Sequence, residues 1–290
     1  MCKMLRAGTI CCALLLVLGQ LMVAGAARAA GPDDVVGMVL DVQGGGELLR
    51  SGRSSKLQLL SYIKPGAQFK LEAGSKASLS HYGAKLIYQL VGPVLAEVGE
   101  DGVKVLNGTP ATTKSLAEKV VAAAVHPNMG AAAFKMRSLG QEIAIQSPIN
   151  RSVQLGARPR FQWSVPEPAS FQLVLTEAPE RVVAKATVEG STWDLPPGTM
   201  LAAGKEYRWS VSYTAPDGQQ RSAAADFTVA TQADAEAMRA LKPGAGAAVD
   251  EWVLYAAILR DRQMLDEARQ VWRDIAAQRP DLTTAHTMAR

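Results

Sequence analysis

The chain has 290 residues, 48% of them hydrophobic, and its 31 basic and 27 acidic residues give a formal net charge of +4. This length is enough for two or three domains, each with a core of its own. The basic residues are dispersed, whereas nucleic-acid phosphates require a concentrated basic surface, so the charge pattern argues against a protein that binds nucleic acid.

The first 29 residues have the pattern of a secretory signal peptide. Lys3 and Arg6 precede an apolar run over residues 10–27, and Ala27-Arg28-Ala29 supplies the small residues that signal peptidase recognises. Cleavage before Ala30 would remove all three cysteines and leave 28 basic and 27 acidic side chains. We therefore expect an exported protein without disulfides or thiolate metal ligands. An uncleaved membrane anchor is the alternative, because the apolar run just reaches spanning length.

Residues 35–107 have the pattern of a β-domain. Val36, Met38, Leu40 and Val42 alternate with other residues, and similar short runs follow up to residue 106. The last two runs, 95–98 and 103–106, flank Gly99-Glu100-Asp101-Gly102, which is typical of a hairpin turn. Many short, evenly spaced strands predict a sandwich or a barrel-like fold.

Three segments of this stretch match the sequence pattern of a known family: Gly37-Met38-Val39, the glycine-bounded residues 66–71, and residues 77–80 followed by Gly83. In these segments the stretch resembles the FecR-type periplasmic domain, although Ala67 and Tyr82 stand where that family favours Asp. FecR-type regulators carry a segment that contacts a sigma factor before a membrane helix. Only nine residues precede the apolar run here, so we expect no transmembrane sigma regulation.

Residues 108–142 predict a partly helical linker. The segment 116–125 is rich in alanine and valine and ends at His126-Pro127, and a second short helical piece spans residues 130–138.

Residues 147–229 are again β-like, with about seven alternating runs separated by Pro- and Gly-rich breaks. This pattern predicts an immunoglobulin-like sandwich, and the stretch resembles a fibronectin type III module. Leu201, Gly204 and Tyr207 have the spacing of a tyrosine corner, in which the tyrosine hydroxyl binds an upstream backbone group.

The C-terminal residues 230–290 form a predicted helical tail, with a first helix over 230–242. Residues 249–280 resemble one tetratricopeptide repeat through Trp252, Ala256, Leu259, Ala268, Trp272, Ala276 and Pro280. An ordinary helical hairpin is the alternative interpretation. A single repeat leaves apolar surface uncovered, since about three stacked repeats are needed for stability. The hairpin must therefore dock on the preceding β-domain, on the helix at 230–242, or on another protein, and its candidate partner-contact residues are Trp252, Tyr255, Leu259 and Trp272.

No catalytic, cofactor or metal site is predicted. His81, His126 and His286 fall in three separate segments without metal-ligand spacing, and no nucleophile elbow, zincin motif or phosphate loop occurs. Acidic pairs such as Asp250-Glu251 and Asp266-Glu267 have explanations as helix starts. Two carboxylates distant in sequence could still serve a glycosidase, so hydrolysis stays open.

The sequence as a whole predicts a mainly β protein with α-helices: a FecR-type β-domain, an immunoglobulin-like sandwich and a C-terminal helical hairpin. Together these resemblances imply a periplasmic, non-enzymatic protein that interacts with another envelope protein. The alternative is a binder of envelope glycans such as peptidoglycan, in which Trp193 and Tyr213 would stack on sugars if they were exposed, although burial in the core is the expectation for aromatic residues with this spacing.

Overall fold

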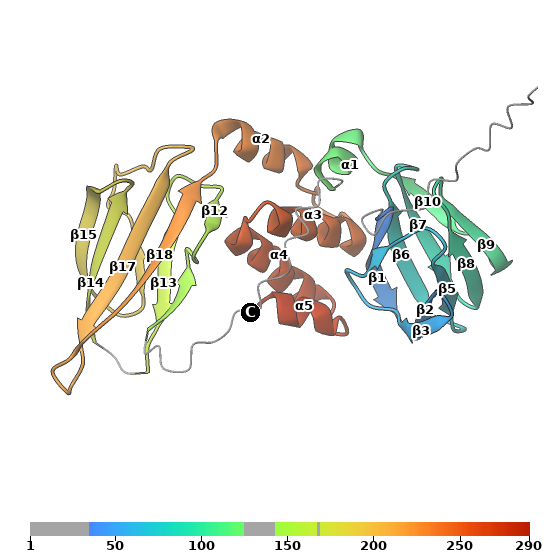
Figure 1. Cartoon of the computed structure of the whole chain (residues 1–290), viewed down its shortest axis with the longest axis horizontal. Helices are drawn as coiled ribbons and strands as arrows, with labels where there is room; N and C mark the ends of the chain where they lie inside the picture. Colours follow the sequence, from blue (N-terminus) through green and yellow to red (C-terminus); the bar gives the residue numbers. More distant parts are fainter. Residues whose placement is uncertain (1–34, 125–142, 167–168) are drawn as a thin grey trace, which may run out of the picture. The chain divides into compact units, whose positions relative to one another are not determined.

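The computed structural model describes residues 35–124, 143–166 and 169–290 (Figure 1). The signal peptide expected at 1–29, His126 and the helical piece expected at 130–138 lie outside these ranges. The described chain is mainly β: its strands form four sheets, and five helices accompany them. None of these helices is long and apolar enough to cross a membrane.

The first β-module, residues 37–115, consists of two antiparallel five-stranded sheets. One has the order β10-β7-β6-β1-β4 and the other the order β3-β2-β5-β8-β9. Val39, Phe69 and Leu79 are fully buried in its core. The strands are β1 (Gly37–Gln43), β2 (Gly46–Arg50), β3 (Arg53–Lys56), β4 (Tyr62–Ile63), β5 (Gln68–Leu71), β6 (Lys76–His81), β7 (Leu86–Val91), β8 (Val94–Val98), β9 (Val103–Gly108) and β10 (Thr112–Ser115).

The predicted hairpin is confirmed, because β8 and β9 pair and the N–H of Gly99 donates to the carbonyl of Gly102 at 2.8 Å. Strand β1 approaches β6 so closely that a Cβ on Gly37 would lie 1.9 Å from the carbonyl oxygen of Ser80. Glycine is required there because any side chain would collide with this backbone atom.

Two strands of this module have no apolar alternation in the sequence. All residues of β3 and β10 are exposed, so hydrophobic periodicity does not reveal them. Strand β10 pairs with β7 and falls within the range predicted as a linker, as does the short helix α1 (Glu118–Ala124).

The second β-module, residues 144–229, is an immunoglobulin-like sandwich. A three-stranded sheet, β11-β13-β16, faces a five-stranded sheet, β12-β18-β17-β14-β15. Phe161 packs against Trp193 and Trp209 at ring-centroid distances of 4.9 and 5.2 Å, and these rings belong to one buried cluster. The strands are β11 (Ala144–Ser147), β12 (Ser152–Gln154), β13 (Arg160–Ser164), β14 (Ser170–Glu177), β15 (Arg181–Glu189), β16 (Thr192–Asp194), β17 (Glu206–Thr214) and β18 (Gln220–Val229).

The predicted tyrosine corner is present in this sandwich. The hydroxyl of Tyr207 accepts a hydrogen bond from the backbone N–H of Ala202 at 2.8 Å, five residues upstream. The Tyr207 ring is buried and stacks on Phe227 with a centroid distance of 5.6 Å.

Four helices follow the sandwich: α2 (Gln232–Leu241), α3 (Val249–Asp261), α4 (Leu265–Gln278) and α5 (Thr283–Met288). The side chain of Thr231 caps α2 by accepting the N–H of Asp234. Helix α4 ends two residues before Pro280, as expected of a residue that cannot continue a helix. Helices α3 and α4 pack against each other and share one hydrophobic cluster with Met38 and Leu40 of β1.

Candidate functional site

The four candidate partner-contact residues lie on the helical hairpin α3–α4, and the chain itself covers most of their surface. Leu259 and Trp272 are fully buried, Tyr255 keeps only 6% of its surface exposed, and Trp252 is half-buried. Trp252 packs edge-on against Tyr255 at 6.2 Å. All four side chains belong to or pack on the cluster that includes Met38 and Leu40. The hairpin therefore docks within its own chain.

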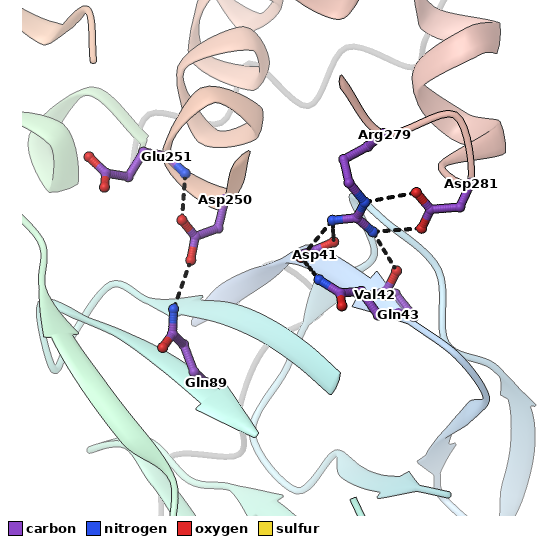
Figure 2. Close-up of polar contacts among 8 residues, drawn as sticks. All are labelled: Asp41, Val42, Gln43, Gln89, Asp250, Glu251, Arg279 and Asp281. Carbon is purple, nitrogen blue, oxygen red and sulfur yellow. Dashed lines mark hydrogen bonds and ion pairs between the residues drawn. The ribbon is translucent and has the colours of Figure 1, made fainter. Parts of the chain in front are cut away.

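A charged contact fastens the end of α4 to strand β1. The guanidinium of Arg279 donates to both carboxylate oxygens of Asp41 at 3.0 Å and to the carbonyl of Val42 at 3.4 Å (Figure 2). It also donates to Asp281 at 2.7 and 2.8 Å. The bonds to Asp281 and then to Asp41 raise the pKa of Arg279, and the bond from Arg279 lowers the pKa of Asp281. Arg279 thus stays charged and holds two acidic groups.

A second contact joins the start of α3 to the same module. The amide of Gln89 on β7 donates to Asp250 at 3.4 Å, and the other carboxylate oxygen of Asp250 accepts the N–H of Glu251 at 2.9 Å (Figure 2). Lys114 on β10 pairs with Glu251, and this hydrogen bond raises the pKa of Lys114. The carboxylates predicted as helix-start residues therefore also connect α3 to the sheet.

A further interface joins the hairpin to the second β-module at β12. Gln154 donates to Asp266 at 2.6 Å, and the N–H of Leu155 donates to Glu267 at 2.8 Å. The carbonyl of Gln263, in the turn between α3 and α4, accepts the N–H of Val153 at 2.8 Å. Both acidic residues lie in the first turn of α4, where negative charge also suits the helix dipole.

Glu267 is the electrostatically unusual member of this interface. Burial raises its pKa above the ordinary value, while the hydrogen bond from Leu155 opposes that shift. Its second carboxylate oxygen, Oε2, is buried and has no hydrogen-bond partner among the described residues. The hydrogen bond from Leu155 therefore replaces only part of the hydration that the ionised Glu267 carboxylate loses on burial.

Sequence reasoning did not identify Asp41, Gln89, Gln154 or Arg279 as interface residues. Asp41 and Arg279 are 238 positions apart, and neither belongs to a motif. The sequence features that mark these interfaces are the acidic pairs at the helix starts. Those pairs are already explained by their favourable position at a helix N-terminus, so they did not indicate a contact with a distant strand.

The residues considered for sugar stacking or metal binding have structural roles. Trp193 and Tyr213 are buried in the sandwich core, as expected from their spacing. His81 is fully buried; one ring nitrogen accepts the N–H of Ala84 and the other lies 3.1 Å from the carbonyl of Gly99. His286 contacts the carbonyl of Pro280. Within residues 35–124, 143–166 and 169–290, no group of three His, Cys, Asp or Glu could hold a metal ion.

No protein-family model matches the chain, and neither does any curated protein. Among solved structures, CopC from Methylosinus trichosporium OB3b aligns with 31% of this chain and 95% of its own, with 14% identity and a TM-score of 0.25. The fibronectin(III)-like modules of Clostridium thermocellum CbhA align with 30% of this chain and 94% of theirs, with 15% identity and a TM-score of 0.23. Similarities at this level carry no functional argument; the immunoglobulin-like assignment rests on the two sheets and the tyrosine corner.

Proposed function

We propose that this protein is an exported, non-enzymatic scaffold of the bacterial periplasm, whose two β-modules bind another envelope protein. In this proposal the first module is of the FecR type, the second is of the fibronectin type III kind, and the hairpin α3–α4 derives from a tetratricopeptide repeat. Export by the leader at residues 1–29 is part of the same proposal.

The observation that carries the proposal is that both interfaces of the hairpin are occupied by the chain's own β-modules. Arg279, Asp250 and Glu251 hold the first module, and Asp266 and Glu267 hold the second. A repeat used in this way joins the modules, and none of the large apolar side chains described for α3 and α4 is exposed to a partner. The partner surfaces are then the outward-facing strands of the two modules.

Exposed apolar side chains on these strands give positions for a test. Leu106 on β9 is 44% exposed and Val182 on β15 is 50% exposed, although large apolar side chains are usually buried. A photo-crosslinking amino acid at Leu106 or Val182, in cells that produce the full chain, should give one discrete adduct with an envelope protein. The same amino acid at Gln270, on the exposed side of α4, is the matched control and should give none.

Three results would count against the proposal. Equal crosslinking from Gln270 would show that the β-modules are not the selective surface. Sedimentation of the purified chain, residues 30–290, with isolated peptidoglycan would favour the glycan-binding alternative. N-terminal sequencing should find a product that begins at or next to Ala30, and a full-length product in the membrane would contradict export by cleavage.

A further inference from the structure

A cavity of about 270 Å³ lies where β10, α1, α2 and α3 converge. Its apolar lining includes Ile87, Leu254, Tyr255 and Ile258, which belong to the cluster shared by the helices and the first β-module. The cavity is partly open to solvent. Of the residues drawn in Figure 2 only Glu251 lines it, and none of the residues that hydrogen-bond to β12 does.

The charged lining of this cavity is mostly positive. Lys114, Lys119 and Lys242 contribute ammonium groups, and Glu251 contributes the carboxylate. Glu251 is paired with Lys114, and Lys119 donates to the carbonyl of Ala240 at the end of α2. Lys242 is exposed and makes no ion pair within the described part of the chain. An excess of positive charge at a cavity whose lining is partly apolar attracts a ligand that combines an anionic group with an apolar body.

We propose that this cavity binds a small aliphatic carboxylate, with its carboxylate at Lys119 and Lys242. Its hydrocarbon chain would lie along the partly exposed Val120, Leu241 and Pro243, next to the buried Ile87, Leu254 and Ile258. A cavity volume of about 270 Å³ suits a short aliphatic chain better than a long acyl chain. The carboxylate stays near solvent, where exposed lysines reach it without the full cost of burying a charge. This inference goes beyond the scaffold function and does not depend on it.

The test uses octanoate as the probe and its uncharged, nearly isosteric analogue octanamide as the matched ligand control. Methyl groups of isoleucine are observed by NMR in the full mature chain, with signals assigned through the Ile87→Val and Ile258→Val variants. Octanoate should shift the Ile87 and Ile258 signals saturably. The Ile143 signal should not move, because Ile143 lies in the sandwich core. Octanamide should bind about tenfold more weakly, since a charge-assisted hydrogen bond is stronger than a neutral one.

Two variants locate the carboxylate and the chain. Lys242→Gln should weaken octanoate binding about threefold to tenfold and leave octanamide binding unchanged, whereas Lys185→Gln, an exposed lysine on β15, should change neither. Ala117→Leu adds bulk to an exposed residue of the lining and should weaken both ligands. Equal affinity for the two ligands, equal behaviour of the two lysine variants, or shifts without saturation would overturn the proposal.

Discussion

The contact between Arg279 and Asp41 offers the sharpest test of how the helices are held. Arg279→Met keeps an unbranched apolar chain but removes every hydrogen bond of the guanidinium. The side chains of Arg279 and Asp41 are only 17% and 14% exposed, so the variant leaves a largely buried carboxylate without its partner. Arg273→Met, on the exposed side of α4, is the control.

The expected cost follows from this intermediate burial. Breaking a fully buried ion pair costs about 3–5 kcal/mol, whereas exposed pairs contribute about 0–1 kcal/mol. The bonds to Asp281 count little, because that carboxylate is 55% exposed and solvent replaces them. We therefore expect Arg279→Met to destabilise the docked helix by about 2–3 kcal/mol, after discounting for solvent screening.

Hydrogen exchange of the α4 amides measures this loss locally, because it reports the free energy of opening of one segment. A cost of about 2–3 kcal/mol corresponds to exchange that is roughly 30- to 150-fold faster. Combining Arg279→Met with Asp41→Asn in a double-mutant cycle should give a coupling energy of about 1–2 kcal/mol. A coupling below about 0.5 kcal/mol, or exchange in Arg279→Met equal to that in Arg273→Met, would refute the reasoning.

Three other predictions follow from contacts in the helices and the sandwich. Tyr207→Phe should lower the free energy of unfolding by about 1–3 kcal/mol, because the N–H of Ala202 loses its acceptor; an unchanged urea midpoint would remove the role of the tyrosine corner. Trp272→Ala should cost about 3–5 kcal/mol by leaving a cavity, whereas Trp272→Phe should cost much less, because the indole N–H it removes has no partner among the described residues; thermal unfolding of both variants compares them. Burial raises the pKa of the Glu267 carboxyl in the folded state, so the folded chain protonates this carboxylate more readily than the unfolded chain does. The ionised carboxylate therefore destabilises the folded chain at neutral pH, and this destabilisation is lost as the pH falls through the folded-state pKa. Glu267→Gln should therefore gain stability over the parent chain at neutral pH, and this gain should shrink in mildly acidic buffer; a gain that grows on acidification would contradict the sign.

The strands that the sequence revealed are those with alternating or glycine-bounded apolar residues. Strand β8, with alternate residues buried, and its glycine-bounded turn to β9 were recognisable because burial on one side imposes a period of two. Strand β1 was recognisable from its apolar alternation, although both of its faces are buried, with Val39 in the module core and Met38 and Leu40 against the helices. Strands β3 and β10 lie with all residues exposed, so their pairing leaves no trace in hydrophobicity. Tyr207 was predictable for another reason, since its spacing from Leu201 and Gly204 is set by a local turn.

The candidate site was only half predictable for a physical reason. Periodicity identified two apolar stripes, one with Trp252, Tyr255 and Leu259 and the other with Trp272, and most of both is buried. A stripe indicates that a face is covered but not what covers it. The covering surface lies on β1 and β12, at sequence separations for which no local pattern exists.

The cluster that unites Met38 and Leu40 with the C-terminal helices has a consequence for the order of folding. Arg279 meets Asp41 across 238 positions, so the outer apolar face of the first β-module has no cover until almost the whole chain has been made. At about 5–20 residues per second, that interval lasts roughly ten to fifty seconds. Such long-range closure is slow, and the waiting face is prone to aggregation. A chaperone that shields the nascent first module should therefore raise the yield of folded protein. A premature stop codon that deletes only the last helices should lower this yield, although those helices are far from the first module in the sequence.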